Sequence, residues 1–251
     1  SGSTPGAGDT IIIADGHNIT VSSDDSCTYL TINSSTGFQY SQLSISTGVT
    51  FTITNDLNIN SGAFLGGLVQ LSGTGILTVS GDINFSGASP AFVESNIDMS
   101  NGASTLNIAG SFSLSSNSET LKRSTTNNVN YNGSSDQTIV FPSGFQYHDL
   151  TINNTGINGA TLGSAVNTTN VNGSITVQSG TLRNGGNTIT GGGSETFRVD
   201  NGATFVLTAL SSWPAAYGTD TLYPTSTVNY AGTGQTVDAG QTYGNLTLSG
   251  T

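Results

Sequence analysis

Apolar and polar residues alternate along many short stretches of the chain. Examples are "FTITNDLNI" from Phe51, "ILTVSGDINF" from Ile76 and "STLNIAGSFSL" from Ser104. A period of two, broken by Gly, Asn, Ser or Asp, predicts short β-strands joined by turns. No stretch of a dozen residues follows the helical period, so we expect almost no helix.

The strands recur in a fixed pattern: apolar-x-apolar-x-(Gly/Asn)-x-apolar-x-apolar. Copies begin at Phe51, Leu77 and Leu106, and a fourth copy begins at Val171. The spacing of the first three predicts an all-β parallel β-helix (β-solenoid) with three short strands and about 26–29 residues per coil, about nine coils in all. Right-handed winding is the default for parallel crossovers. A hairpin sandwich also has regular turns, but it does not need a repeat of about 27 residues.

In such a fold, alternate residues of each strand lie on the same face of the sheet. We therefore expect the Ile, Val, Leu and Phe positions to point inward and to form ladders from coil to coil. Thr, Ser and Asn would point outward. Gly and Asn are expected at the corners, where the backbone needs a positive φ.

A second, longer repeat of about 100 residues overlies the coils. Tyr131 and Tyr230 begin matching segments that share Gly, Gln-Thr, Tyr and Leu-Thr positions. A weaker copy covers 19–32. We therefore expect one elongated β-solenoid over 1–251, with a first coil at 1–28, modules at 29–148 and 149–244, and the start of a further coil at 245–251.

These repeated segments resemble a known group of proteins. "STVNYAGTGQTVDAGQTYGNLTLSG" from Ser226 and "PGAGDTIIIADGHNITV" from Pro5 are similar to modules of very long secreted and surface-attached bacterial proteins. Many of those are exported by the type IX route and serve as adhesins or stalks. The resemblance covers most of the chain, rests on structural motifs and carries over no catalytic residue. It implies an extracellular location, on the cell surface or in a matrix. Unlike those arrays, this one stops after about two modules, without a sorting domain.

Charge and composition narrow the range of partners. The chain has 15 acidic and 4 basic residues among 251, for a net charge of −11. Phosphate contacts need Lys and Arg, so we expect no nucleic-acid partner. A membrane-spanning helix needs roughly 20 consecutive apolar residues, and since no apolar run comes near that length, no membrane span is expected. Cys27 has no second cysteine to pair with; we interpret it as a small buried residue, with a reactive thiol as the alternative.

Catalytic chemistry is not predicted. Glycan-cleaving β-helices need clustered carboxylates for acid–base work, whereas the acids here are scattered. Asp82 and Asp98 could stack in adjacent coils, but exposed turns explain them better. Asp24 and Asp25 are weak candidates for a Ca²⁺ site. We expect no enzyme activity and no cofactor.

One segment, Ala209–Ser226, breaks the coil period and holds the single Trp. If it forms a protruding loop, Trp213, Tyr217 and Tyr223 could stack on a surface glycan or dock another partner. The alternative is that these rings fold back over the flank of the solenoid. A Thr row at 50–54 is typical of ice-binding solenoids, but the matching copy "ILTVS" does not continue it.

The chain stops at 247–251 on an ordinary coil start, where solenoids usually carry an atypical cap. Either the sequence is a fragment of a longer chain, or another copy covers this edge and the protein forms a head-to-tail filament. The candidate assembly residues are Ile11, Ile12, Ile13, Leu246 and Leu248.

Three functional hypotheses remain open. The first is an extracellular structural protein: a stalk, an adhesin segment or a filament subunit. The second is a carbohydrate-binding or carbohydrate-active β-helix that uses the Trp213 loop. The third is an ice-binding solenoid.

Overall fold

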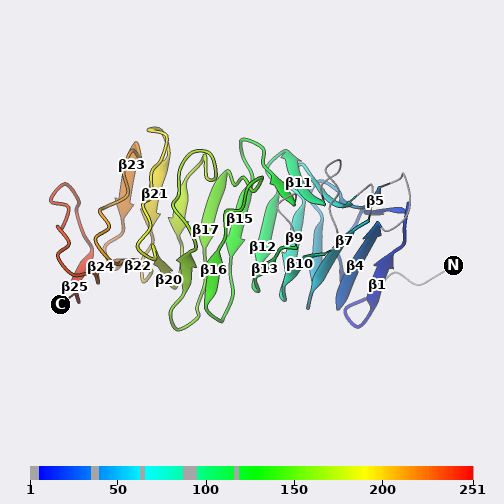
Figure 1. The fold of residues 1–251 in the computed structure, drawn as a ribbon, viewed down its shortest axis with the longest axis horizontal. Coiled ribbons are helices and arrows are strands. Elements are labelled where there is room, and N and C mark those ends of the chain that lie inside the picture. Colours follow the sequence, from blue (N-terminus) through cyan, green and yellow to red (C-terminus); the bar gives the residue numbers. More distant parts are fainter. Residues whose placement is uncertain (1–5, 35–39, 63–65, 87–94, 116–118, 251) are drawn as a thin grey trace. The chain divides into compact units, whose positions relative to one another are not determined.

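The computed structural model describes residues 6–34, 40–62, 66–86, 95–115 and 119–250. These residues form strands, turns and bridges, and they contain no helix (Figure 1). They divide into two compact units. The first unit comprises Ser1–Asn128 and Pro142–Gln146, and the second comprises Val129–Phe141 and Tyr147–Thr251.

The first unit is built from three parallel sheets, and each coil adds one strand to each sheet. The first sheet contains β1 (Thr10–Ile13), β4 (Tyr29–Ser34), β7 (Leu57–Ser61), β10 (Ile83–Ser86) and β13 (Phe112–Ser113). The second contains β2 (Asn18–Val21), β5 (Ser41–Ile45), β8 (Gly67–Ser72), β11 (Asn96–Asn101) and β14 (Thr120–Lys122). The third contains β3 (Asp25–Cys27), β6 (Thr50–Ile53), β9 (Ile76–Val79) and β12 (Thr105–Ile108).

Inward side chains of this unit form apolar ladders. Leu30 lies opposite Leu57, which lies opposite Ile83, and all three are buried. Outward positions on the same strands carry polar ladders, since Asn60 Nδ2 donates to Asn33 Oδ1 (2.8 Å) one coil earlier. Alternation along these strands therefore separates an apolar interior from an exterior on which polar side chains form hydrogen bonds from coil to coil.

The second unit has two parallel sheets. One contains β15 (Asn128–Tyr131), β17 (Asp149–Ile152), β19 (Ile175–Val177), β21 (Thr196–Val199) and β23 (Thr219–Leu222). The other contains β16 (Gln137–Ile139), β18 (Ala160–Leu162), β20 (Thr181–Arg183), β22 (Thr204–Leu207), β24 (Thr227–Tyr230) and β25 (Asn245–Leu248). Its third side is held by single bridges, such as Tyr147 to Val171 and Val166 to Ile189.

The predicted all-β parallel β-solenoid is confirmed. The predicted coil length holds from β4 onward in the first and third sheets of the first unit, where Leu30 faces Leu57 and Leu77 faces Leu106. It is too long for the second unit, where Leu150 faces Ile175 and Ile175 faces Phe197. Single bridges in place of a third strand account for these shorter coils.

Corner acids link one coil to the next. In the first unit, Asp56 Oδ1 accepts the backbone N–H of Asp82 (2.8 Å), and Asp82 Oδ1 accepts that of Ser111 (2.7 Å). Asp149 Oδ1 accepts the N–H of Ser174 (2.8 Å) in the same way within the second unit. Each carboxylate therefore satisfies a backbone donor about one coil later in the chain, as a capping side chain does.

Every one of these carboxylates lies against a glycine. A Cβ added at Gly81, Gly110 or Gly173 would come within 3.0 Å of the carboxylate oxygen and of backbone atoms of the preceding coil. None of the three has a positive φ, so the expectation that these corner glycines serve φ is wrong. It does hold at Gly48, where φ is +75°. We call the pairing of a corner Asp with the glycine of the next coil the carboxylate–glycine step.

Candidate functional site

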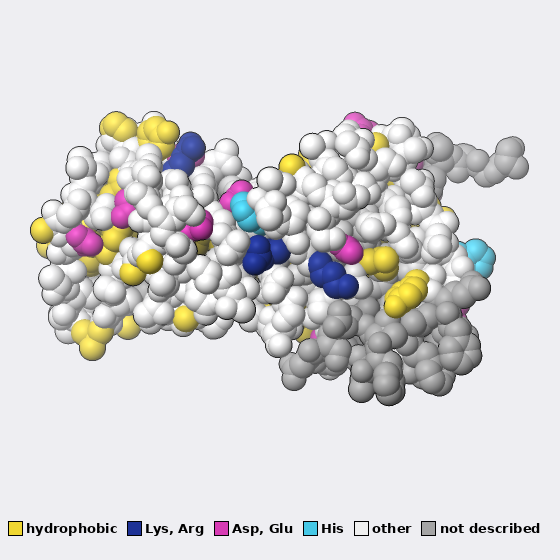
Figure 2. Space-filling view, turned by 90° about the horizontal axis from the view of Figure 1, so that it is seen from above, with side chains coloured by type: hydrophobic (Ala, Val, Ile, Leu, Met, Phe, Trp, Pro, Cys, Tyr) yellow, Lys and Arg dark blue, Asp and Glu magenta, His cyan; other side chains and the backbone are white. Residues whose placement is uncertain are grey.

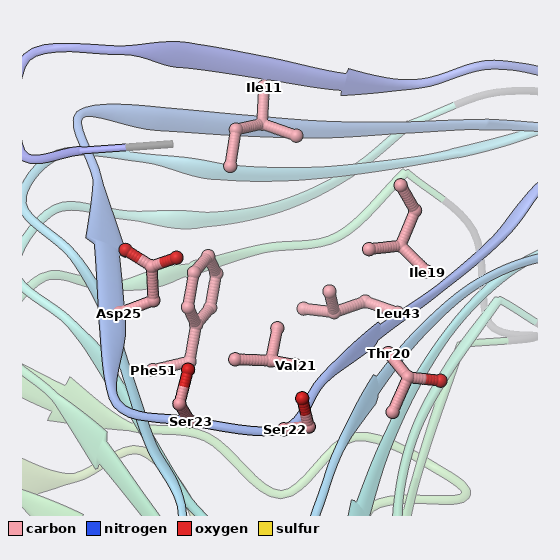
Figure 3. A pocket seen from close by; sticks show the side chains of 9 residues that line it. All are labelled: Ile11, Ile19, Thr20, Val21, Ser22, Ser23, Asp25, Leu43 and Phe51. Atoms are coloured by element: carbon pink, nitrogen blue, oxygen red, sulfur yellow. The ribbon is translucent and has the colours of Figure 1, made fainter. Parts of the chain in front are cut away.

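The first coil of the first unit encloses a hollow of about 210 Å³ (Figure 3). Its wall comes from β1, β2, β3 and the two strands β5 and β6 of the following coil. The lining is mainly apolar, with hydroxyls on one part of the rim, and consists of Ile11, Ile19, Thr20, Val21, Ser22, Ser23, Asp25, Leu43 and Phe51.

Asp25 is the one charged residue of this lining. In the register of the third sheet it lies opposite Phe51, which lies opposite Leu77 in the next coil. Asp25 thus occupies an inward position that carries a large apolar side chain in later coils. Figure 3 shows its carboxylate beside the Phe51 ring. Its Oδ1 accepts the N–H of Ser26 (2.8 Å), and the side chain is half-buried.

Cys27 follows on the same strand and is fully buried, as the first interpretation of this residue expected. Burial raises the pKa of its thiol to about 11, and the negative charges of Asp25 and Asp9 add to the effect. The thiol therefore stays protonated at neutral pH, which opposes the alternative of a reactive thiolate.

Asp24 and Asp25 do not act as a pair. Asp24 is exposed, and its Oδ1 accepts the N–H of Thr50 (2.8 Å), whereas Asp25 belongs to the lining of the hollow. Within the described ranges, no group of three or more His, Cys, Asp or Glu side chains could hold a metal ion. The weak Ca²⁺ hypothesis for these two residues thus gains no support from their geometry.

Trp213 lies in the core of the second unit and not on a protruding loop. Its side chain is 7% exposed, and its Nε1 donates to Asp220 Oδ2 (2.8 Å). The ring packs edge-on against Phe197 (5.6 Å between centroids) and Phe205 (5.8 Å). The prediction of Trp213 as an exposed contact is therefore wrong; the alternative, in which the rings fold back, describes it.

Tyr217 and Tyr223 are half-buried and also have partners within the second unit. Tyr217 packs against Phe197 (5.7 Å), and burial raises the pKa of its hydroxyl, with the charges of Glu195 and Asp220 adding to the effect. The Arg198 guanidinium lies over the Tyr223 ring (5.1 Å). A role for these two rings in binding a ligand stays a prediction.

The tyrosines of the longer repeat form a shared structure. The hydroxyls of Tyr131 and Tyr147 are 3.0 Å apart, and Tyr147 donates to the carbonyl of Val140 (2.9 Å). Tyr230 and Tyr243 repeat this arrangement at 2.9 Å, with Tyr243 donating to the carbonyl of Asp238 (2.7 Å). We call each such pair a tyrosine clasp. Burial raises the pKa of Tyr131 to about 12, so the first clasp carries no charge at neutral pH.

In the same repeat, each glutamine side chain accepts a hydrogen bond from the backbone N–H of a glycine three or four residues earlier in the chain. Gln137 Oε1 accepts the N–H of Gly133 (2.9 Å), and Gln235 Oε1 accepts the N–H of Gly232 (2.6 Å). In both copies of the repeat, tyrosine bonds to tyrosine and the glycine N–H bonds to the glutamine side chain, so the longer repeat encodes a structural motif of the second unit.

The assembly candidates lie on β1 and β25. Ile13 is buried, Ile11 is half-buried and Ile12 is 63% exposed. On β25, Leu246 and Leu248 are 43% and 66% exposed. Both strands thus present apolar side chains to solvent.

No protein-family model matches the chain, and neither the curated proteins nor the solved structures include a significant match. A search for helices long and apolar enough to cross a membrane found none in the described ranges.

Proposed function

We propose that this chain is an extracellular structural segment, a stalk or adhesin spacer of a bacterial surface or matrix. The observation that carries the proposal is the repeated joining of coil to coil, by parallel strand pairing and by the carboxylate–glycine step, in both units. A fold of this kind gains length with each added coil and needs no ligand to do so. The resemblance of the repeated Tyr–Gln segments to adhesin and stalk modules supports the location.

The exterior suits a spacer. Figure 2 shows a face on which charged side chains occur only in small groups. Polar ladders, such as Gln42 Nε2 to Gln70 Oε1 (2.9 Å), give neighbouring coils further hydrogen bonds at their surface. Such a surface is hydrated and has few charges whose interactions salt would screen.

The proposal is tested on cells of the native source. Intact cells are treated with protease, and the released peptides are identified by mass spectrometry. We expect peptides of this chain among those released, with a cytoplasmic enzyme as the control that stays protected. Recovery of the chain only from the cytoplasmic fraction would refute an extracellular role. The intact mass of the mature chain then separates a subunit near 25.5 kDa from a spacer within a longer protein.

A head-to-tail filament is the second structural role. The exposed Leu246 and Leu248 support it, but Asp25 opposes it. A second copy stacked on the first coil would bury the Asp25 carboxylate against apolar side chains, and an unpaired buried charge is strongly destabilising. We therefore place the spacer role first. Sedimentation velocity over a range of protein concentrations separates the two, because a filament subunit sediments faster as concentration rises.

Neither a carbohydrate-binding nor an ice-binding role is proposed, since the Thr row at 50–54 has no matching row in the next copy. The carbohydrate hypothesis rested on an exposed Trp213 ring, and that ring is buried.

A further inference from the structure

We propose that the hollow in the first coil binds a primary ammonium group carried on a short aliphatic chain. In this site the Asp25 carboxylate pairs with the ammonium, and Ile11, Ile19 and Phe51 contact the methylene groups. This binding site does not depend on the spacer role proposed above.

The apolar lining of the hollow indicates that the main part of the ligand is a hydrocarbon. Five of the nine lining residues are Ile, Val, Leu or Phe, so the hollow favours a hydrocarbon over a sugar or a peptide backbone. A volume of about 210 Å³ holds on the order of seven groups the size of a water molecule. A chain of four to six carbons with a terminal nitrogen fills that space.

The carboxylate sets the charge of the ligand. Asp25 replaces an apolar residue at an inward ladder position, where Phe51 and Leu77 follow in the next coils. Its Oδ1 takes the Ser26 N–H, and in the part of the chain that the structure describes no donor reaches Oδ2. A half-buried carboxylate in a largely apolar wall favours a cationic partner that donates hydrogen bonds to it.

The surroundings of Asp25 point the same way. Asp25 acts on the buried Cys27 together with Asp9, and Asp24 precedes it in the chain, so the charged groups that the structure associates with this strand are acidic. The net charge of −11 also attracts cations from a distance. Lys122, the one lysine of the chain, lies on β14, and β11, β8 and β5 separate that strand from β2 at the hollow. Among the residues that the structure describes, no side-chain ammonium therefore reaches the hollow, and we assign the ammonium to another molecule.

Primary amines fit better than the other common cations. An alkylammonium is a compact charge with three N–H donors at the end of a slender chain. One donor can pair with Asp25, while the hydroxyls of Ser22 and Ser23 on the rim can accept the others. A lysine side chain of another protein and a free aliphatic amine share this chemistry.

The test is a methyl NMR titration of the full chain at pH 7. The probes are hexylammonium, 1-hexanol and hexanoate, which share a carbon chain and differ in charge. We expect hexylammonium to shift the methyl signals of Ile11 and Ile19, and hexanol to bind at least about tenfold more weakly because it forms no charge-assisted bond. Hexanoate should not bind. Equal affinity for hexylammonium and hexanol in the unmodified protein would overturn the proposal.

Two variants locate the site. Asp25→Asn should weaken hexylammonium binding by about tenfold or more while leaving hexanol binding unchanged. Asp24→Asn is the matched control: it removes the same charge one residue away, from a side chain outside the lining, and should bind as the unmodified protein does. An equal loss in both variants would show attraction to net charge alone and would contradict the site.

A further titration identifies the source of the ammonium. A peptide with blocked termini and one internal lysine is compared with hexylammonium. Shifts of the same methyl signals by both probes support a lysine presented by a protein, and shifts by hexylammonium alone support a free amine. Neither probe shifting these signals would refute the site, whatever the cell-surface experiment shows.

Discussion

Glycine has two separate roles in this chain, and they can be told apart residue by residue. Gly48 has a φ of +75° and open space around the position of a Cβ. Gly81 has no positive φ, but a Cβ there would meet the Asn55 carbonyl group and the Asp56 carboxylate. The first role is conformational, and the second is the close approach of two coils.

Replacement of these glycines by alanine should separate the two roles. For Gly81→Ala we expect a loss of about 1–3 kcal/mol in the free energy of unfolding, because the backbone of the previous coil cannot move aside cheaply. Gly48→Ala should cost about 1–2 kcal/mol through the left-handed backbone alone. Urea denaturation measures both. Gly8→Ala, with open space and no positive φ, is the control and should leave stability unchanged. A Gly81→Ala variant as stable as Gly8→Ala would contradict the carboxylate–glycine step.

Asp136 makes the stability of the second unit depend on pH in the acidic range. Its carboxylate accepts the side-chain N–H of Asn158 (2.6 Å) and the backbone N–H of Asn158 (2.8 Å), and these bonds hold its pKa below the usual value. The ionised form is favoured by folding. The stabilisation is therefore fully present above the unfolded pKa of about 3.9 and is lost as the pH falls through the lower folded pKa.

A carboxyl NMR titration tests this. In Asn158→Ala the pKa of Asp136 should rise toward its ordinary value, because the largest cause of the shift is the Asn158 side chain. Asn201→Ala changes an asparagine that contacts Thr225 elsewhere in the unit, and it should leave the Asp136 pKa unchanged. If the Asp136 pKa is the same in Asn158→Ala as in the unmodified chain, this assignment is wrong.

At the scale of elements, the tyrosine clasps replace sheet pairing where the chain leaves the sheets. The clasp of Tyr131 and Tyr147 spans the segment that contains β16, and the clasp of Tyr230 and Tyr243 spans the segment that leads to β25. In the first clasp, Tyr131 donates to Tyr147, which donates to a carbonyl, so two buried hydroxyls are satisfied in a chain.

Removal of one hydroxyl should show how much a tyrosine clasp contributes to the free energy of unfolding. Tyr147→Phe removes the acceptor of the Tyr131 hydroxyl hydrogen and the donor to the Val140 carbonyl, so we expect a loss of about 1–3 kcal/mol in the free energy of unfolding. Thermal or urea denaturation followed by circular dichroism measures it. Tyr29→Phe changes an exposed tyrosine on β4 and should have little effect. Equal stability of the two variants would mean that the clasp contributes nothing.

The elements also show where sequence patterns succeed and where they fail. Alternation at Phe51–Ile53 and Leu77–Val79 predicts strands correctly, because each inward residue meets an apolar partner in the next coil. The shorter coils of the second unit were not predicted, since single bridges such as Val166 to Ile189 leave no alternating pattern. The Tyr–Gln repeat was visible in the sequence, but only the hydroxyl contacts show that it is structural.

At the scale of the whole molecule, Asp25 lies on β3, an end strand of its sheet among the described residues. Among the described residues, β1, β2 and β3 are the end strands of their sheets, and Ile12 and Ile19 are exposed. End strands of this kind favour association with other strands. An inward-pointing charge at such an edge makes stacking costly, which is a recognised way for β-proteins to stay apart. The same carboxylate can thus bind a cation and repel an apolar copy.

If the Asp25 carboxylate prevents stacking, its replacement by an apolar residue should increase self-association. Asp25→Leu restores the apolar ladder position and should sediment as larger species at concentrations where the unmodified chain stays monomeric. Sedimentation velocity measures this, and Asp24→Asn is the control with the neighbouring charge removed. Identical sedimentation of all three proteins would show that Asp25 does not limit association.

The candidate site was only partly predictable from the sequence. The sequence indicates Ile11 as an assembly residue and Asp25 as a weak metal ligand, but nothing in the sequence joins them. Their common hollow depends on the register that sets Asp25 opposite Phe51, and β3 is a very short strand. The sequence does not reveal that Trp213 is buried, because its partners come from other strands of the unit. These partners are Phe197, Phe205 and Asp220.

The carboxylate–glycine step also constrains how such a protein can be lengthened. The acid and the glycine that makes room for it come from different coils, as Asp56 and Gly81 do. Consider a gene duplication that copies a segment from one corner glycine to the residue just before the next corner glycine. The copied segment contains a corner acid, and the coil that follows this acid again begins with a glycine. A recombination that joins an acid-bearing coil to one with a larger residue at that corner creates a clash. Splice points for lengthened arrays, natural or engineered, should therefore fall immediately before the corner glycines.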